Sequence, residues 1–186
     1  GTAAYIDTLS EAQKVLVDQL TGALFPIADD VKIQIEFNPA QVVEYRLIGY
    51  ETRALTREDF NNDRVDAGEI GAGRQVTALY EVVPAGSPAR LTDPLRYADA
   101  PAAAETGAGK TGELGFLKLR WKAPGADQSQ LMETPIAATL GPADDDARFA
   151  AAIAGFGQLL TGGTYLQGWG WQDAITLAAG AKGADP

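Results

Sequence analysis

The alternation of apolar and polar residues constrains the fold of this chain more than any other feature. In the segment 31–37, apolar side chains alternate with Lys32, Gln34 and Glu36, and the segment 115–122 repeats the pattern. Further apolar runs cover residues 43–50, 76–83 and 131–140, the last of which is interrupted by Pro135. A period of two is typical of strands that are buried on one face only. Because no helical pattern separates these runs, we expect the strands to pair antiparallel.

Helical patterns occur at both ends of the chain. Thr8 and Glu11 have the spacing of a capping box, and apolar residues then recur every three or four positions as far as Gly22. Similar patterns cover residues 144–160, which begin with three aspartates, and residues 171–180. The sequence therefore predicts a mainly β fold, an antiparallel β-sandwich with one N-terminal helix and two C-terminal helices.

Composition excludes several classes of function. The chain has no Cys and no His, so it has no disulfide, no thiolate nucleophile, no imidazole base and no histidine-ligated metal. Its formal net charge is −10, and its basic residues are dispersed, which argues against nucleic acid and against an anionic membrane surface as partners. We expect neither an enzyme nor a resident cofactor, and no direct membrane contact by this chain.

A cluster of oxygen-bearing side chains lies between two of the predicted strands. It comprises Asp59, Asn61, Asp63, Asp66 and Glu69. The first three have the spacing of an EF-hand loop, but Arg64 and Ile70 stand where that loop needs Gly and Glu. Since calcium accepts irregular oxygen cages, these five residues are a candidate calcium site. The alternative, which we favour, is a polar connection rich in turn-forming residues.

Two further features bear on function. Trp169 and Trp171 lie in a glycine-rich connector, and with the carboxylates of residues 59–69 they leave open a carbohydrate-binding or hydrolytic module as the alternative function. Residues 104–111 satisfy the relaxed phosphate-loop pattern, but an alanine-rich stretch precedes them and a strand follows. We therefore expect no nucleotide site there, and we expect residues 98–111 to form a surface excursion.

Longer segments carry a family resemblance. They read DVKIQIEFNPAQVVEYRLIGYE (30–51), EDFNNDRVDAGEIGAGRQVTALYE (58–81), DPLRY (93–97), GELGFLKLRWKAPG (112–125) and RFAAAIAGFGQLL (148–160). These segments resemble the YfbK-type C-terminal domain of bacterial von Willebrand factor type A domain proteins. Residues 4–20 resemble the closing helix of the A domain that precedes it. This family usually has a His where Arg74 stands, so the resemblance implies no His-dependent role here.

The resemblance implies a place in a larger protein. Residues 1–24 would be the terminal helix of a preceding A domain, and residues 25–186 a β-sandwich domain whose helical part begins near residue 144. Parents of this type are envelope proteins with an export or lipoprotein signal, so we expect a periplasmic or extracellular location. We expect a non-catalytic interaction or scaffolding module with a protein partner. Without the A domain, the N-terminal helix could instead pair between two copies of the chain.

Overall fold

The computed structural model describes residues 5–18, 24–49, 54–93, 112–139 and 141–183. The expected surface excursion at 98–111, the phosphate-loop pattern at 104–111 and the end of the N-terminal helix lie outside these ranges. Contacts divide the chain into two compact units. Unit 1 comprises residues 1–41, 53–76 and 102–138, and unit 2 comprises residues 42–52, 77–101 and 139–186.

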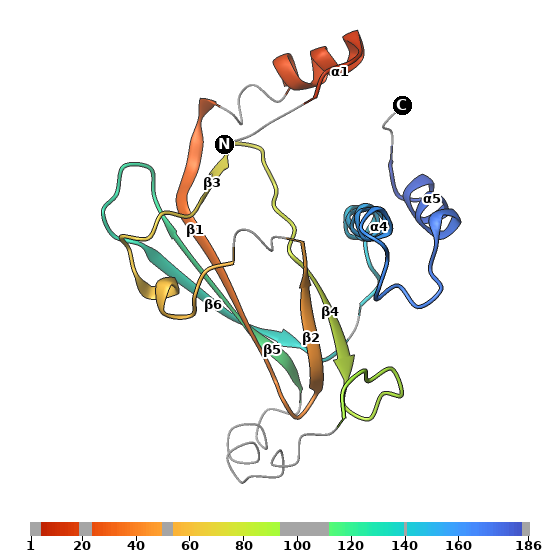
Figure 1. The fold of residues 1–186 in the computed structure, drawn as a ribbon. Coiled ribbons are helices and arrows are strands. Elements are labelled where there is room, and N and C mark those ends of the chain that lie inside the picture. The colour runs from red at the N-terminus through yellow and green to blue at the C-terminus, as the bar shows by residue number, and fades with distance from the viewer. Residues whose placement is uncertain (1–4, 19–23, 50–53, 94–111, 140, 184–186) are drawn as a thin grey trace. The chain divides into compact units, whose positions relative to one another are not determined.

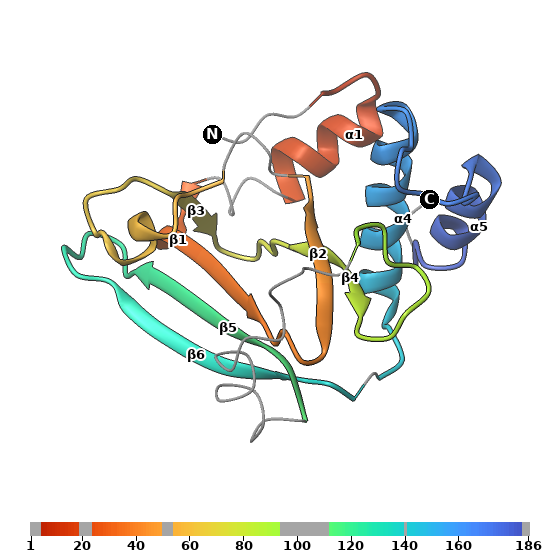
Figure 2. The same ribbon diagram turned by 60° about the horizontal axis from the view of Figure 1, so that its bottom comes forward.

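Unit 1 is built on a four-stranded antiparallel sheet with the order β3-β1-β5-β6 (Figures 1 and 2). The strands are β1 (Pro26–Phe37), β3 (Gly68–Gly71), β5 (Glu113–Lys122) and β6 (Gln130–Ala137). In the central pair, Ile33 lies opposite Leu119 and Lys32 opposite Arg120. Because side chains alternate along a strand, the apolar residues and the basic residues project from opposite faces of this pair.

The N-terminal helix of unit 1 begins where the capping box predicts. The Thr8 hydroxyl accepts a hydrogen bond from the Glu11 N–H (3.1 Å), and α1 covers Leu9–Gln13. The segment continues as a π-helical turn over Lys14–Asp18 rather than as the regular α-helix that the sequence predicts. Val15 and Val17 lie in that turn, and β-branched side chains crowd the preceding turn of an α-helix.

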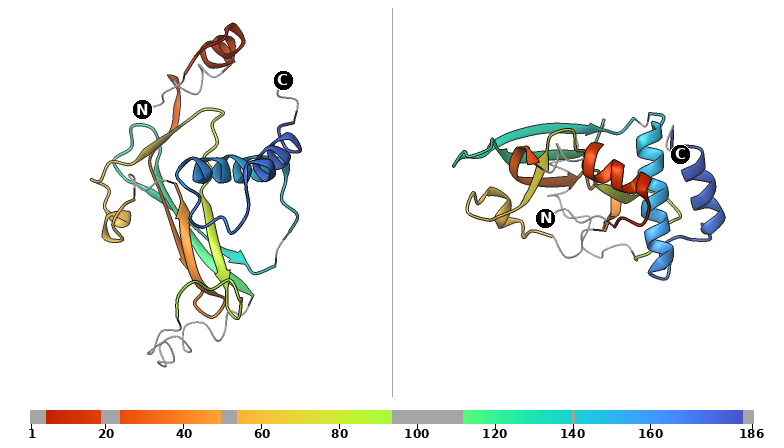
Figure 3. Two further views of the ribbon diagram at one scale, coloured as in Figure 1. Left: turned by 45° about the vertical axis from the view of Figure 1, so that its right-hand side comes forward. Right: turned by 90° about the horizontal axis from the view of Figure 1, so that it is seen from above.

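Unit 2 combines a two-stranded antiparallel sheet with two helices. Its strands are β2 (Val42–Ile48) and β4 (Leu79–Pro84), and its helices are α4 (Asp145–Leu160) and α5 (Trp171–Ala179), which pack against each other (Figure 3). The Asp144 carboxylate caps α4 by accepting from the Ala147 N–H (2.8 Å). The Asp173 carboxylate accepts from the Gly170 N–H (2.8 Å) at the start of α5.

The predicted fold class is confirmed: the described strands pair antiparallel in two sheets, with one helix before them and two after. Two short elements were not predicted, the strand β3 and the 3-10 helix η3 (Glu58–Asn61). The strand β1 also begins five residues before the predicted segment, at Pro26. The alternation fails there because Asp30 has a positive φ of 51° and the register shifts beside it.

Trp169 packs against α4 at a buried glycine, Gly155. A Cβ atom built on Gly155 would overlap the six-membered ring of the Trp169 indole. Alanine is the better helix former, so its absence here is explained by the indole and not by the helix. This contact fixes the connector between α4 and α5 on the helix.

Gly155→Ala should lower the free energy of unfolding by about 1–3 kcal/mol, because the indole must move off the helix. Urea denaturation measures this loss. Trp169→Leu in the Gly155→Ala background should recover part of it, since the smaller side chain makes room for the methyl group. A neutral or stabilising Gly155→Ala would contradict the packing described.

Candidate functional site

The five candidate calcium residues lie in a segment of unit 1 that covers the basic face of β1 and β5. Asp59 and Asn61 belong to η3, Asp63 and Asp66 follow it, and Glu69 lies exposed on β3. Phe60, which is only 4% exposed, fastens η3 to the unit. The Asn62 side chain accepts from the Arg64 N–H (3.1 Å) and so forms the turn that follows η3.

Lys32 of β1 is 2% exposed and points into this segment. Its ammonium group donates to the backbone carbonyl of Asn62 (2.6 Å) and, at 3.4 Å, to that of Asp59. Each of these carbonyls also accepts one backbone N–H at 3.2 Å, Asp59 from Asn62 and Asn62 from Val65. Because a carbonyl oxygen has two lone pairs, Lys32 adds a second donor to each of them. Its positive charge lies among the oxygens of the candidate calcium site.

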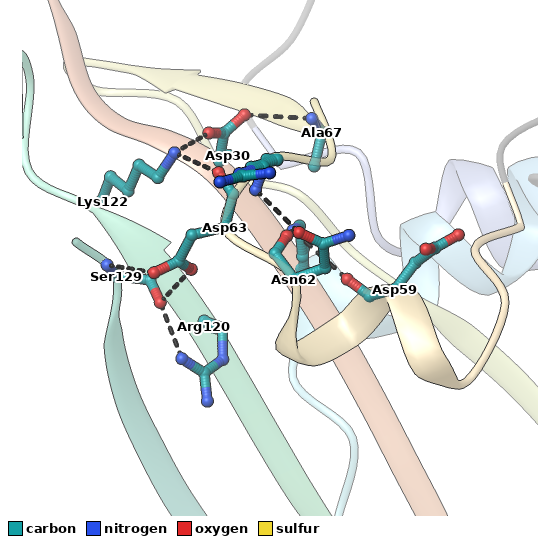
Figure 4. A network of polar contacts seen from close by, with 10 residues as sticks. Asp30, Asp59, Asn62, Asp63, Ala67, Arg120, Lys122 and Ser129 are labelled. Carbon is teal, nitrogen blue, oxygen red and sulfur yellow. Dashed lines mark hydrogen bonds and ion pairs between the residues drawn. The ribbon is translucent and has the colours of Figure 1, made fainter. Parts of the chain in front are cut away.

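Lys122 of β5 makes the second such contact (Figure 4). Its ammonium group lies 2.7 Å from the Asp30 carboxylate and 2.7 Å from the backbone carbonyl of Asp63. The other Asp30 oxygen accepts from the Ala67 N–H (3.1 Å). The segment between η3 and β3 is thus held at both of its ends.

The Asp63 carboxylate is engaged by Ser129, which directly precedes β6 (Figure 4). The Ser129 hydroxyl donates to one carboxylate oxygen (2.6 Å), and its backbone N–H lies 3.3 Å from the other. Arg120 donates to the same hydroxyl (2.7 Å) and to the side-chain oxygen of Asn61 (3.3 Å). Its guanidinium also lies 5.7 Å from the centre of the Phe60 ring.

These contacts shift the pKa values of three groups. The hydrogen bond from Lys122 is the largest cause that holds the pKa of Asp30 below its usual value of 3.8. The hydrogen bonds from Ser129 lower the pKa of Asp63, the hydroxyl contributing most. In return, Asp30 raises the pKa of Lys122 above 10.5. All three groups are therefore stabilised in their charged forms near neutral pH, which suits a structural network better than proton transfer.

The structure brings Asp59, Asn61 and Asp63 into one network, with Asp66 as a further hydrogen-bonding neighbour of Asp30. Within the described ranges, no three carboxylates are grouped closely enough to hold a metal ion. The calcium site stays a prediction, and it would have to compete with lysine, arginine and serine donors for the same oxygens. Sequence reasoning missed the donors themselves, because Lys32 and Lys122 occupy positions that the alternation assigns to a solvated face.

The candidate tryptophans belong to unit 2. Trp169 is half-buried and lines a hollow of about 350 Å³ with residues of α4 and β4. Trp171 is 49% exposed and stands edge-on to Phe156, with ring centres 5.8 Å apart. The acidic residues 59–69 belong to unit 1, so the two parts of the carbohydrate hypothesis fall in different units. That hypothesis stays a prediction.

Arg46 organises the polar side of unit 2. Its guanidinium is paired with the Glu81 carboxylate, donates to the Gln158 side chain (2.7 Å) and lies 4.3 Å from the centre of the Tyr165 ring. The strands β2 and β4, the helix α4 and the connector after it thus meet at one cation. We assign a structural role to this arrangement, because the Arg46 guanidinium donates charge-assisted hydrogen bonds that connect β2 to β4 and to α4.

Comparison with known proteins places the chain in a family. A family model described as "Uncharacterized protein YfbK, C-terminal" matches residues 22–186. The chain belongs to this family. The sequence is 51% identical, over all 186 residues, to a YfbK protein of Escherichia coli (strain K12), also described as uncharacterized. No solved structure matches the chain.

The comparison confirms the resemblance to the YfbK C-terminal domain. The chain spans 32% of the length of the E. coli relative, about a third. The expected link to a von Willebrand A domain, the envelope location and the division at residue 24 stay predictions. No helix in the described part of the chain has the length and hydropathy needed to cross a membrane.

Lys32→Met should lower the free energy of unfolding by about 1–3 kcal/mol, because the carbonyls of Asn62 and Asp59 lose their charged donor and keep only one backbone N–H each. Chemical denaturation is the measurement. Lys118→Met is the matched control: Lys118 forms a partly exposed ion pair with Glu133 (3.6 Å), and its replacement should cost no more than about 0.5 kcal/mol. Equal losses for the two variants would show that Lys32 has no special role.

Asp30→Asn should weaken the acid dependence of stability. A carboxylate whose pKa is lowered on folding adds stability above its usual pKa of 3.8, and that stability is lost as pH falls through the folded value. The contribution of Lys122, whose pKa is raised, is present below 10.5 and is lost as pH rises through its folded value. The measurement is the urea midpoint of unfolding at a series of pH values between about 2 and 6. As pH is lowered, this midpoint should fall less steeply for the variant than for the parent. Parallel pH profiles would contradict the pairing.

Proposed function

We propose that this chain is a non-catalytic interaction module that docks on another part of a larger envelope protein. The observation that carries the proposal is the segment formed by α1 and the π-helical turn after it. Its apolar side chains are exposed: Leu9 at 87%, Leu16 at 57% and Val17 at 64%, and α1 has no buried residue. An exposed apolar face of this kind marks an interaction surface.

The comparison supports the choice of partner. About two thirds of the E. coli relative's length lies outside the part that this chain matches. In a protein of that length, a further region of the same polypeptide would be available to cover the helix. The family resemblance suggests that this region is a von Willebrand A domain, in which residues 1–24 would complete the fold. The same resemblance suggests the envelope location.

The chemistry of the described residues supports a non-catalytic role. Hydrogen bonds from Lys122 and Ser129 lower the pKa values of Asp30 and Asp63 and hold both carboxylates ionised, and Asp30 holds the ammonium of Lys122 protonated. A general base or nucleophile needs a pKa near the working pH and an open path to a substrate. We therefore assign the polar network to stability and the apolar helix to function.

Docking of the helix can be tested by amide hydrogen exchange. In a chimera, this chain would replace the matching third of the E. coli relative, and exchange at residues 5–17 would be compared with that in the isolated chain. Burial of the apolar side chains should slow exchange there at least about tenfold, because a fraying terminal segment would then be held by a partner.

Leu16→Asp in the chimera should abolish the protection, because the charge cannot be buried against an apolar surface. Gln13→Asp introduces the same charge at an exposed polar position of the same helix and should retain it. Equal exchange in the chimera and the isolated chain would refute docking through this helix.

A further inference from the structure

The helix α4 has two apolar faces, and the described residues of unit 2 cover only one of them. The covered face carries small residues, among them Ala154 and Gly155, against which Trp169 packs. The opposite face carries the large residues Ile153, Phe156 and Leu160, which are 50%, 43% and 65% exposed. A helix that packed only on its own unit would place its large apolar residues inward.

The helix α5 extends the exposed face. Trp171 and Ile175 are 49% and 60% exposed, and the Trp171 ring contacts Phe156 edge-on. We call the following residues the α4–α5 patch: Ile153, Phe156, Leu160, Trp171 and Ile175. An aromatic side chain carries about 150–250 Å² and an aliphatic one somewhat less, so the five side chains, about half exposed, present on the order of 500 Å² of apolar surface. That is the size at which surface patches are commonly interaction sites.

A glycine in the middle of this face has no explanation within the described chain. Gly157 lies in α4 and is exposed, and a Cβ atom built on it meets nothing within 4 Å. Its φ is not positive, so its backbone does not require glycine. A helical glycine is less favourable than alanine, and no contact among the described residues compensates for this cost at Gly157.

The position of Gly157 in α4 indicates where a side chain from a second helix would pack. Residues 153, 156, 157 and 160 have the spacing i, i+3, i+4 and i+7, which surrounds one gap on the surface of a helix. Such a gap receives a side chain from a facing helix. With glycine at one corner, the gap is wide enough for a large residue. Phe156 is the large exposed residue at the next corner of the same gap.

We propose that the α4–α5 patch is a contact between two copies of this chain, in which Phe156 of each copy packs into the gap over Gly157 of the other. A two-fold contact needs a surface that fits itself, and this patch carries the projecting ring and the gap side by side. Two patches would bury about 1,000 Å², the lower bound for a specific interface. The contact should therefore be reversible and of moderate affinity.

The charges of α4 permit this contact. The acidic residues Asp144, Asp145 and Asp146 lie at the start of the helix, eleven to thirteen residues before Gly157. At 1.5 Å per residue they lie about 18 Å from the crossing point. That distance exceeds the Debye length of about 8 Å at physiological salt, so the acidic turns of two copies would not oppose association.

Light scattering of the full 186-residue chain over a range of concentrations tests the proposal. The mass should rise with concentration from 19.5 kDa toward twice that value. Phe156→Glu should remain a monomer throughout. Ala147→Glu is the matched control, because Ala147 is exposed in the first turn of α4, on the side away from Phe156, and this variant should dimerise like the parent.

Gly157→Ala keeps the test decisive if Phe156→Glu fails to fold. Without a partner, alanine should raise the melting temperature by about 2–4 °C, since it favours the helix. In the dimer the added methyl fills the gap, so the dissociation constant should rise at least tenfold. Higher melting temperature with weaker association supports the proposal, and higher melting temperature with unchanged association refutes it.

Other results also decide the matter. A chain that stays monomeric at millimolar concentration refutes the proposal. A dimer that survives Phe156→Glu but is lost in Leu16→Asp places the contact on the N-terminal helix instead. A dimer lost in Phe156→Glu and kept in Leu16→Asp supports the α4–α5 patch and leaves docking of α1 on a larger protein as a separate question.

Discussion

The hydrogen bonds from two lysine ammonium groups to backbone carbonyls are the interaction on which unit 1 depends. Lys32 lies opposite Arg120 in the register of β1 and β5, and Lys122 follows two residues later, so all three basic side chains project from one face. The segment from η3 to β3 covers that face and turns its carbonyls and the Asp63 carboxylate toward it. A sheet face that is basic in sequence is thereby closed by an acidic connection.

This arrangement gives part of the acidic connection donors from the chain itself. Calcium and an ammonium group both recruit carbonyl and carboxylate oxygens. The ammonium groups of Lys32 and Lys122 belong to the chain itself and connect the segment to β1 and β5. A calcium ion at this place would compete with them for the same oxygens.

Two exposed apolar surfaces support the interaction module that we propose. In unit 1 the segment of α1 carries exposed leucines, and in unit 2 the α4–α5 patch surrounds Gly157, which is exposed. The surfaces lie in different units, and we propose a different partner for each. These partners are another region of a larger protein for the segment of α1 and a second copy of the chain for the α4–α5 patch. Membership of the YfbK C-terminal family and the greater length of the E. coli relative fit a part that works within a larger assembly.

The sequence by itself determined the fold class, the antiparallel pairing, both helix caps at Thr8 and Asp144, and the family, because these depend on local periodicity and on side chains close in sequence. It also located the acidic connection. Only the tertiary structure shows which donors of the chain contact that connection. Asp63 and Lys122 are 59 residues apart, and no local pattern reports whether a polar residue on a strand faces water or a covering segment. The same holds for Gly155 and Gly157: they look alike in sequence, and only packing shows that the first is filled by Trp169 while the second is open.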